Sequence, residues 1–198
     1  MKKILLCMTM AIALVAGKQA QANGALDQLV RDMAVADLTH SVNEGMRVNN
    51  LINWKVGETA EYDLKAMFGS LGNMVKKVDR EQGNAIWLKQ EVTGMAAQTI
   101  EALIDRATGE VLEMRQNGQK VNPPNDKPEM IDQEHTTVTV PAGTFEVIHV
   151  TFKSKEVKKG ELWANPRDIP MDGAAKMAVE SNQMPLPITM ELLKFSRP

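Results

Sequence analysis

The sequence predicts a mainly β protein built from one antiparallel sheet of about nine strands, preceded by a single helix. From Trp54 onward, apolar residues recur at every second position, which is the period of a half-buried strand. Short turns join these segments, and no helical crossover long enough to link parallel strands lies between them. No internal repeat or composition shift divides the 198 residues, so 23–198 is expected to form one domain.

Residues 1–22 have the three parts of a secretory signal peptide. Lys2 and Lys3 form a basic start, and the apolar run 4–17 is too short for a comfortable membrane span. The small residues of Ala20-Gln21-Ala22 then provide a cleavage signature. The pattern predicts cleavage near Ala22 and a periplasmic or secreted mature protein, in the envelope of a Gram-negative bacterium.

Removal of this segment changes the charge and the cysteine content. Without its three lysines, the 23 basic residues fall to 20 against 25 acidic ones, a net charge of −5. A nucleic-acid partner is therefore not expected, since such a partner calls for a basic face. Cys7 is the single cysteine and lies in the segment, which excludes disulfides, thiolate metal sites and a cysteine nucleophile in the mature chain.

The one clear helical pattern covers Ala25–Leu38. Its apolar residues recur at helical spacing and form one stripe, made of Leu26, Leu29, Val30, Met33 and Ala34. The pattern predicts an amphipathic helix whose stripe packs against the sheet.

The alternating segments follow in chain order. They are 60–68, 73–80, 85–92, 98–104, 110–116, 136–140, 145–153, 160–164, 175–179 and 186–195. Glu81–Asn84 and Pro141–Thr144 have the composition of hairpin turns. Leu112 and Met114 are expected on one face of their strand, and the proline-rich stretch 117–128 is expected to be a long loop.

A search for catalytic motifs predicts that the protein is not an enzyme and holds no cofactor or metal. The sequence has no nucleophile elbow and no glycine-rich phosphate loop. His40, His135 and His149 do not have the spacing of metal ligands, and His149 is expected to be a strand histidine bonded to a neighbour. Glu61 and Asp63 alternate with apolar residues and should face solvent.

Methionine is unusually frequent in the mature chain. Eleven remain after cleavage: Met33, Met46, Met67, Met74, Met95, Met114, Met130, Met171, Met177, Met184 and Met190. Copper(I) binding is disfavoured because no close-set M-x-M or M-x-x-M cluster occurs. Two alternatives stay open, namely ordinary core filling and the lining of an adaptable apolar cavity.

Two stretches resemble a known family. Thr137–Val147 is similar to a hairpin of uncharacterised exported bacterial β proteins, and Trp163, Ile169–Gly173 and Lys176 resemble the strand, loop and strand that close them. These stretches span about the last third of the chain. The family resembles the periplasmic lipoprotein-carrier (Lol-type) half-barrel superfamily. The resemblance implies a curled antiparallel sheet, or half-barrel, around an apolar groove plugged by helices.

The leading functional hypothesis is an exported, non-enzymatic protein that binds or carries an apolar or amphiphilic ligand. Its partner would be a lipid or a lipidated protein, since a sheet with one apolar face can be covered by a segment that the ligand displaces. The expected groove residues are Leu29, Met33, Tyr62, Leu64, Met114, Met177 and Met190.

The alternative is a structural or interaction protein of the envelope, with a core filled by its own side chains and no ligand. The loop 165–173 would then contact an envelope protein, with Ile169, Pro170 and Met171 as an exposed apolar tip. A competing interpretation has the same loop folded back on the core.

Overall fold

The computed structural model describes residues 24, 28, 33, 52–67, 69–122, 128–155, 157–181 and 187–198. The prediction of a mainly β fold with one antiparallel sheet is confirmed, and the described strands number eleven. They are β1 (Thr59–Ala66), β2 (Gly69–Gln82), β3 (Ala85–Gly94), β4 (Gln98–Asp105), β5 (Val111–Gln116), β6 (Gln119–Val121), β7 (Glu129–Val140), β8 (Gly143–Lys153), β9 (Val157–Ala164), β10 (Ala174–Ser181) and β11 (Ile188–Ser196).

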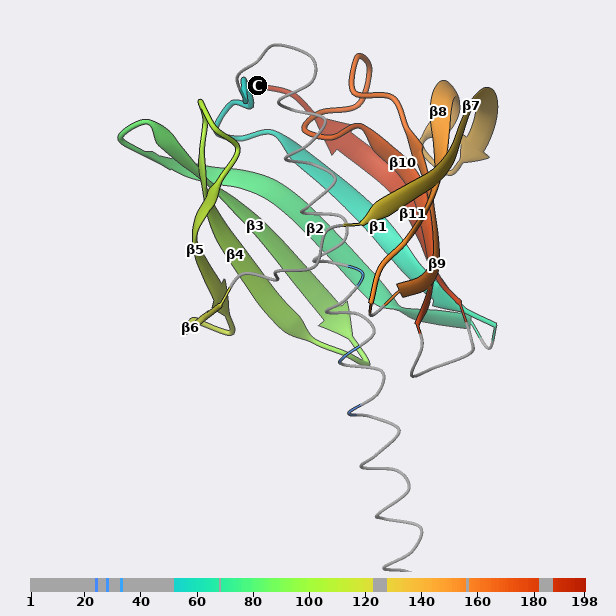
Figure 1. Cartoon of the computed structure of the whole chain (residues 1–198), viewed down its shortest axis with the longest axis horizontal. Helices are drawn as coiled ribbons and strands as arrows, with labels where there is room; N and C mark the ends of the chain where they lie inside the picture. Colours follow the sequence, from blue (N-terminus) through green and yellow to red (C-terminus); the bar gives the residue numbers. More distant parts are fainter. Residues whose placement is uncertain are drawn as a thin grey trace, which may run out of the picture.

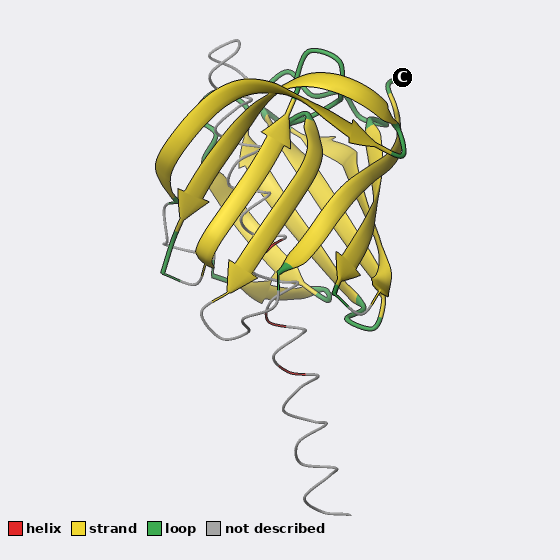
Figure 2. Ribbon diagram, turned by 90° about the vertical axis from the view of Figure 1, so that its right-hand side faces the viewer, coloured by secondary structure: helices red, strands yellow, loops and turns green. Residues whose placement is uncertain are grey.

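The sheet is an open meander whose first and last strands meet in its middle. Its order is β6-β5-β4-β3-β2-β1-β11-β10-β9-β8-β7, so every pair except β1–β11 is sequential in the chain. Strands β6 and β7 follow one another in the sequence but form the two opposite edges. The sheet curls strongly, and its two halves face each other across the concave side (Figures 1 and 2).

Alternation along the strands separates a buried concave face from a more polar convex face. In β1, Ala60, Tyr62 and Leu64 are buried, whereas Glu61 and Asp63 are partly exposed as expected. The same alternation in β2, β10 and β11 builds one continuous apolar cluster on the concave side. Burial of this face is the main favourable contribution to folding, at about 25 cal/mol per Å² of apolar surface.

Two local expectations are wrong for identifiable reasons. Stretch 117–128 was expected to be a loop because its second half is rich in proline, but its first half contains the short strand β6. Leu112 sits in a bulge opposite the step from Leu103 to Ile104, so it is 50% exposed and does not share a face with buried Met114.

The signal peptide and most of the predicted N-terminal helix lie outside the described residues. Gly24, Gln28 and Met33 are described, and each has helical conformation. Met33 is 1% exposed and belongs to the main core cluster, which agrees with a stripe that packs on the sheet. The helix as a whole stays a prediction. Within the described ranges, no helix is long and apolar enough to cross a membrane.

Candidate functional site

The concave face brings most of the predicted groove residues together. Met177 pairs with Met190 across β10 and β11, and Met190 pairs with Leu64 of β1. Tyr62 and Met33 belong to the same buried cluster. Met114 pairs with Ala102 and therefore lies on the same face, but it packs with Ile100 in a smaller cluster. Leu29 lies outside the described residues.

Methionine is concentrated in the main concave cluster. Its buried members there are Met33, Met74, Met171, Met177 and Met190. An unbranched thioether side chain repacks at low cost, so this lining can adapt its shape more readily than a surface of leucine or valine. Met67, Met95 and Met130 are exposed and contribute nothing to the lining.

A buried ion pair lies within the apolar face. The Lys76 ammonium group is 2.9 and 3.0 Å from the two carboxylate oxygens of Asp172, and both side chains are fully buried. The ammonium group also lies 5.7 Å from the centre of the Tyr62 ring. A buried charge is tolerated only when it is paired, so each of these two side chains requires the other.

This pair was not predicted from the sequence, although one of its two residues has a recognisable pattern around it. Lys76 occupies an inward position between Met74 and Val78, both of which face the core. A lysine in register with apolar neighbours on a buried face implies a buried carboxylate elsewhere in the chain. Sequence spacing alone did not identify that carboxylate, because Asp172 is 96 residues away.

Residues 165–173, which connect β9 to β10, form a plug across the concave face, and we call them the plug loop. Asp172 of this loop reaches Lys76 on β2, although β1 and β11 separate β2 from β10 in the sheet. The Tyr62 hydroxyl donates a hydrogen bond of 3.2 Å to the carbonyl of Ala174, directly after the loop. These two contacts place the loop over the inner side of the central strands.

Of the two interpretations of this loop, the exposed apolar tip is wrong and the loop folded back on the core is confirmed. Ile169 is 0% exposed and Met171 is 5% exposed, and Pro170 is buried as well. Their side chains complete the core cluster, because an apolar tip next to an uncovered apolar face is more stable when it is buried there.

Polar contacts hold the plug loop in this inward course. The Asn165 side-chain oxygen accepts hydrogen bonds from the backbone N–H groups of Arg167 and Asp168. The Arg197 guanidinium group, near the C-terminus, donates to the carbonyls of Pro166, Arg167 and Ile169. Gly173 has φ +77°, and a Cβ there would lie 2.2 Å from the Pro166 nitrogen, so the loop closes only with glycine.

A buried carboxylate lies at the start of β1. Glu58 is 8% exposed, and its Oε2 atom has no hydrogen-bond partner among the described residues. Burial raises the pKa of this carboxyl group above its ordinary value, and this effect exceeds the opposing influence of the Lys55 backbone N–H and of the Arg197 charge.

We expect Glu58→Gln to change the pH dependence of stability. Because the folded-state pKa is raised, the contribution of Glu58 to stability is fully present below the unfolded pKa and is lost as pH rises through the folded value. Glutamine stays neutral, so the difference between the thermal midpoints of variant and wild type should widen from pH 4 to pH 7 in favour of the variant. Exposed Glu110→Gln is the control, and equal widening in both variants would contradict the assignment.

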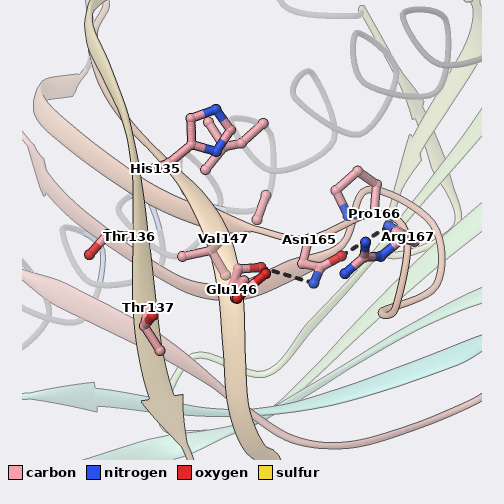
Figure 3. Close-up of a pocket in the computed structure, with 10 residues that line it drawn as sticks. His135, Thr136, Thr137, Glu146, Val147, Asn165, Pro166 and Arg167 are labelled. Carbon is pink, nitrogen blue, oxygen red and sulfur yellow. Dashed lines mark hydrogen bonds between the residues drawn. The ribbon is translucent and has the colours of Figure 1, made fainter.

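A second concavity lies beside the edge of the sheet. It has a volume of about 500 Å³ and is lined by residues of β7 and β8 and by the beginning of the plug loop. Figure 3 shows Asn165 of the loop bonded to the strand at Glu146, with Arg167 next to it and His135 on the neighbouring strand. Its lining combines charged, polar and apolar side chains.

His149, which was predicted to be a strand histidine bonded to a neighbour, lies on the convex face. His149 stacks on Trp163 with 4.4 Å between ring centres and an interplanar angle of 4°. Its Nδ1 atom is 3.1 Å from Glu134, in agreement with the expectation of a strand histidine bonded to a neighbour. Over the part of the chain that the structure describes, no group of three or more His, Cys, Asp or Glu side chains could hold a metal ion.

No protein family and no curated protein matches the chain. Among solved structures, a candidate lipoprotein from Parabacteroides distasonis is similar, with 12% identity, a TM-score of 0.44, and 72% of this chain and 96% of that chain covered. A candidate exported protein with a YmcC-like fold from Bacteroides fragilis has 16% identity and a TM-score of 0.39, with 72% and 97% covered. The MucA/MucB complex structure from Pseudomonas aeruginosa has 11% identity and a TM-score of 0.41, with 81% and 56% covered. Likenesses this distant carry no argument about this chain.

Proposed function

We propose that the chain is an exported, non-enzymatic protein that binds an apolar or amphiphilic ligand, such as a lipid or the acyl chain of a lipoprotein, on its concave face. The observation that carries this proposal is a continuous apolar inner face on a sheet whose two edges do not meet. Because the sheet does not close on itself, segments that are not strands must cover this face, and the plug loop and Met33 both contribute to the cover.

A cover of this kind can exchange with a ligand. A non-strand segment packs through its side chains, and a bound acyl chain can replace those contacts with apolar surface of its own, at about 25 cal/mol per Å² buried. The five buried methionines support the proposal because their flexible side chains can adapt to chains of different length. The buried Lys76–Asp172 pair fixes the plug loop, so we expect a ligand to displace the cover at Met33.

The test uses tryptophan as a contact sensor for the concave face. Trp54 belongs to the main core cluster, whereas Trp87 packs in a separate cluster with Ala85 and Leu103 on the convex face. Two single-tryptophan proteins, one with Trp54 and one with Trp87, would be titrated with fatty acids brominated at different positions along the chain. Bromine quenches tryptophan fluorescence only near contact.

We expect saturable quenching of Trp54 for at least one bromine position and none of Trp87. Mass spectrometry of an organic extract of the purified mature protein should identify the co-purified lipid. Absence of saturable binding together with an extract free of lipid would show that the core is permanently filled, which is the structural alternative. Quenching of Trp87 instead would place the ligand on the convex face.

A further inference from the structure

Strand β7 is an open edge of the sheet along most of its length. It pairs with β8 on one side and has no neighbour among the described strands on the other. Every residue from Glu129 to Thr137 is exposed, so none of the described segments covers this stretch. An edge of this length presents a row of backbone N–H and C=O groups to which another extended chain can pair.

On the convex side, the charged side chains of β7 itself are all carboxylates, and two of them contact basic side chains of β8, Glu129 with Lys153 at 3.3 Å and Glu134 with His149 at 3.1 Å. Glu129, Asp132 and Glu134 occupy successive positions there, opposite Lys153, Thr151 and His149 of β8. The spacing between Glu129 and Asp132 is one residue longer than strict alternation, because the register shifts between Met130 and Asp132. A strand added to β7 would therefore have these three carboxylates beside it on one of its faces.

This charge pattern selects against a second copy of the chain. Two β7 strands paired edge to edge would bring the acidic side chains of both copies together, and like charges on paired strands are destabilising. Basic side chains at alternate positions of an added strand would face the same carboxylates favourably. The occupant that fits is therefore a different polypeptide with alternating basic residues.

The concave side of the same edge offers apolar contacts at one end. Met130 is 49% exposed and pairs with the core residue Phe152, and Ile131, which is 55% exposed, lies in the bulge beside it. Farther along, His135 and Thr137 line the second concavity described above. An added strand would thus contact apolar side chains near Met130 and a mixed pocket near His135.

We infer that β7 is a docking edge for an extended segment of a partner protein, which adds a strand to the sheet and places basic residues toward Glu129, Asp132 and Glu134. This surface is separate from the concave face, so the inference does not depend on ligand binding there.

The probe is a capped ten-residue peptide of alternating lysine and valine with a fluorescent label, titrated into the mature protein and followed by anisotropy. We expect saturable binding, with at least a tenfold loss of affinity in the double variant Asp132→Lys/Glu134→Lys. The same variant should gain affinity for a peptide of alternating glutamate and valine. Glu91→Lys, on the exposed convex side of β3, is the matched control and should bind the lysine peptide like wild type.

A second measurement separates strand addition from a simple charge effect. A lysine–valine peptide that is N-methylated at every second amide keeps its charge but cannot donate hydrogen bonds along one edge. Loss of binding for at least one of the two methylation phases supports strand addition. The inference would be overturned if both methylated peptides bound with the affinity of the parent peptide. It would also be overturned if Glu91→Lys lost as much affinity as the double variant, or if the parent peptide showed no saturable binding.

Discussion

Replacing Asp172 with alanine is expected to lower the free energy of unfolding by about 3–5 kcal/mol, the usual cost of removing one partner of a buried ion pair. Lys76 would remain fully buried in the apolar cluster with its ammonium charge unmatched by Asp172. The plug loop would also lose the contact that ties it to β2. Chemical denaturation of variant and wild type measures the difference directly.

Two further variants separate the buried charge from the loss of a side chain. Adding Lys76→Met to Asp172→Ala removes the buried ammonium charge as well and should restore most of the lost stability, because buried pairs can often be replaced by apolar residues at little cost. Glu61→Ala, which breaks the exposed pair between Glu61 and Lys194, should cost less than about 1 kcal/mol. A double variant as unstable as Asp172→Ala alone would show that Asp172 acts through contacts other than Lys76.

Sequence periodicity was sufficient to predict the sheet, because its central strands have one buried and one exposed face. In β1 the inward residues Tyr62 and Leu64 alternate with the outward Glu61 and Asp63, and each strand of this kind shows a period of two. The short turns between such strands implied an antiparallel meander. The pairing of β1 with β11 could not be predicted in the same way, because these strands are not consecutive in the chain. Their pairing depends on the curl of the whole sheet.

The errors lie where burial does not follow a period of two. The first half of β7 was not recognised as a strand because both of its faces are exposed, so its apolar and polar residues do not alternate. For the plug loop the sequence left two interpretations open, an exposed apolar tip and a loop folded back on the core, and burial of Ile169 and Met171 agrees with the second. Its inward course depends on Lys76 and Arg197, which are distant in the sequence.

The same limit applies to the residues that were predicted to line a groove. Tyr62, Leu64, Met177 and Met190 were placed on one face by alternation, and the structure puts them in one buried cluster. Met114 has the correct face but lies toward the β6 edge, in a different cluster. Alternation determines on which face a residue lies, but the strand order determines which residues of that face are neighbours.

Replacing Leu29 and Met33 with serine should weaken the cover of the concave face while the hairpins of the sheet stay formed. Met33 is buried in the main cluster, and the helical spacing of the sequence places Leu29 on the same stripe. If the ligand enters only when the cover is displaced, a loss of about 1.4 kcal/mol in cover packing raises the open population tenfold. Stopped-flow mixing with a fluorescent fatty acid should therefore show association that is several-fold faster, together with a lower thermal midpoint.

Two neighbouring residues outside the stripe provide the matched control for this measurement. Asp27→Ser/Gln28→Ser changes two polar residues of the same segment and should leave the association rate near that of wild type. The two hypotheses for this protein then differ in outcome, because a permanently filled core gives no saturable binding in wild type or in either variant, and only a fall in stability. A double variant at Leu29 and Met33 that binds the fatty acid more slowly than wild type would mean that the N-terminal segment forms part of the binding surface and does not cover it.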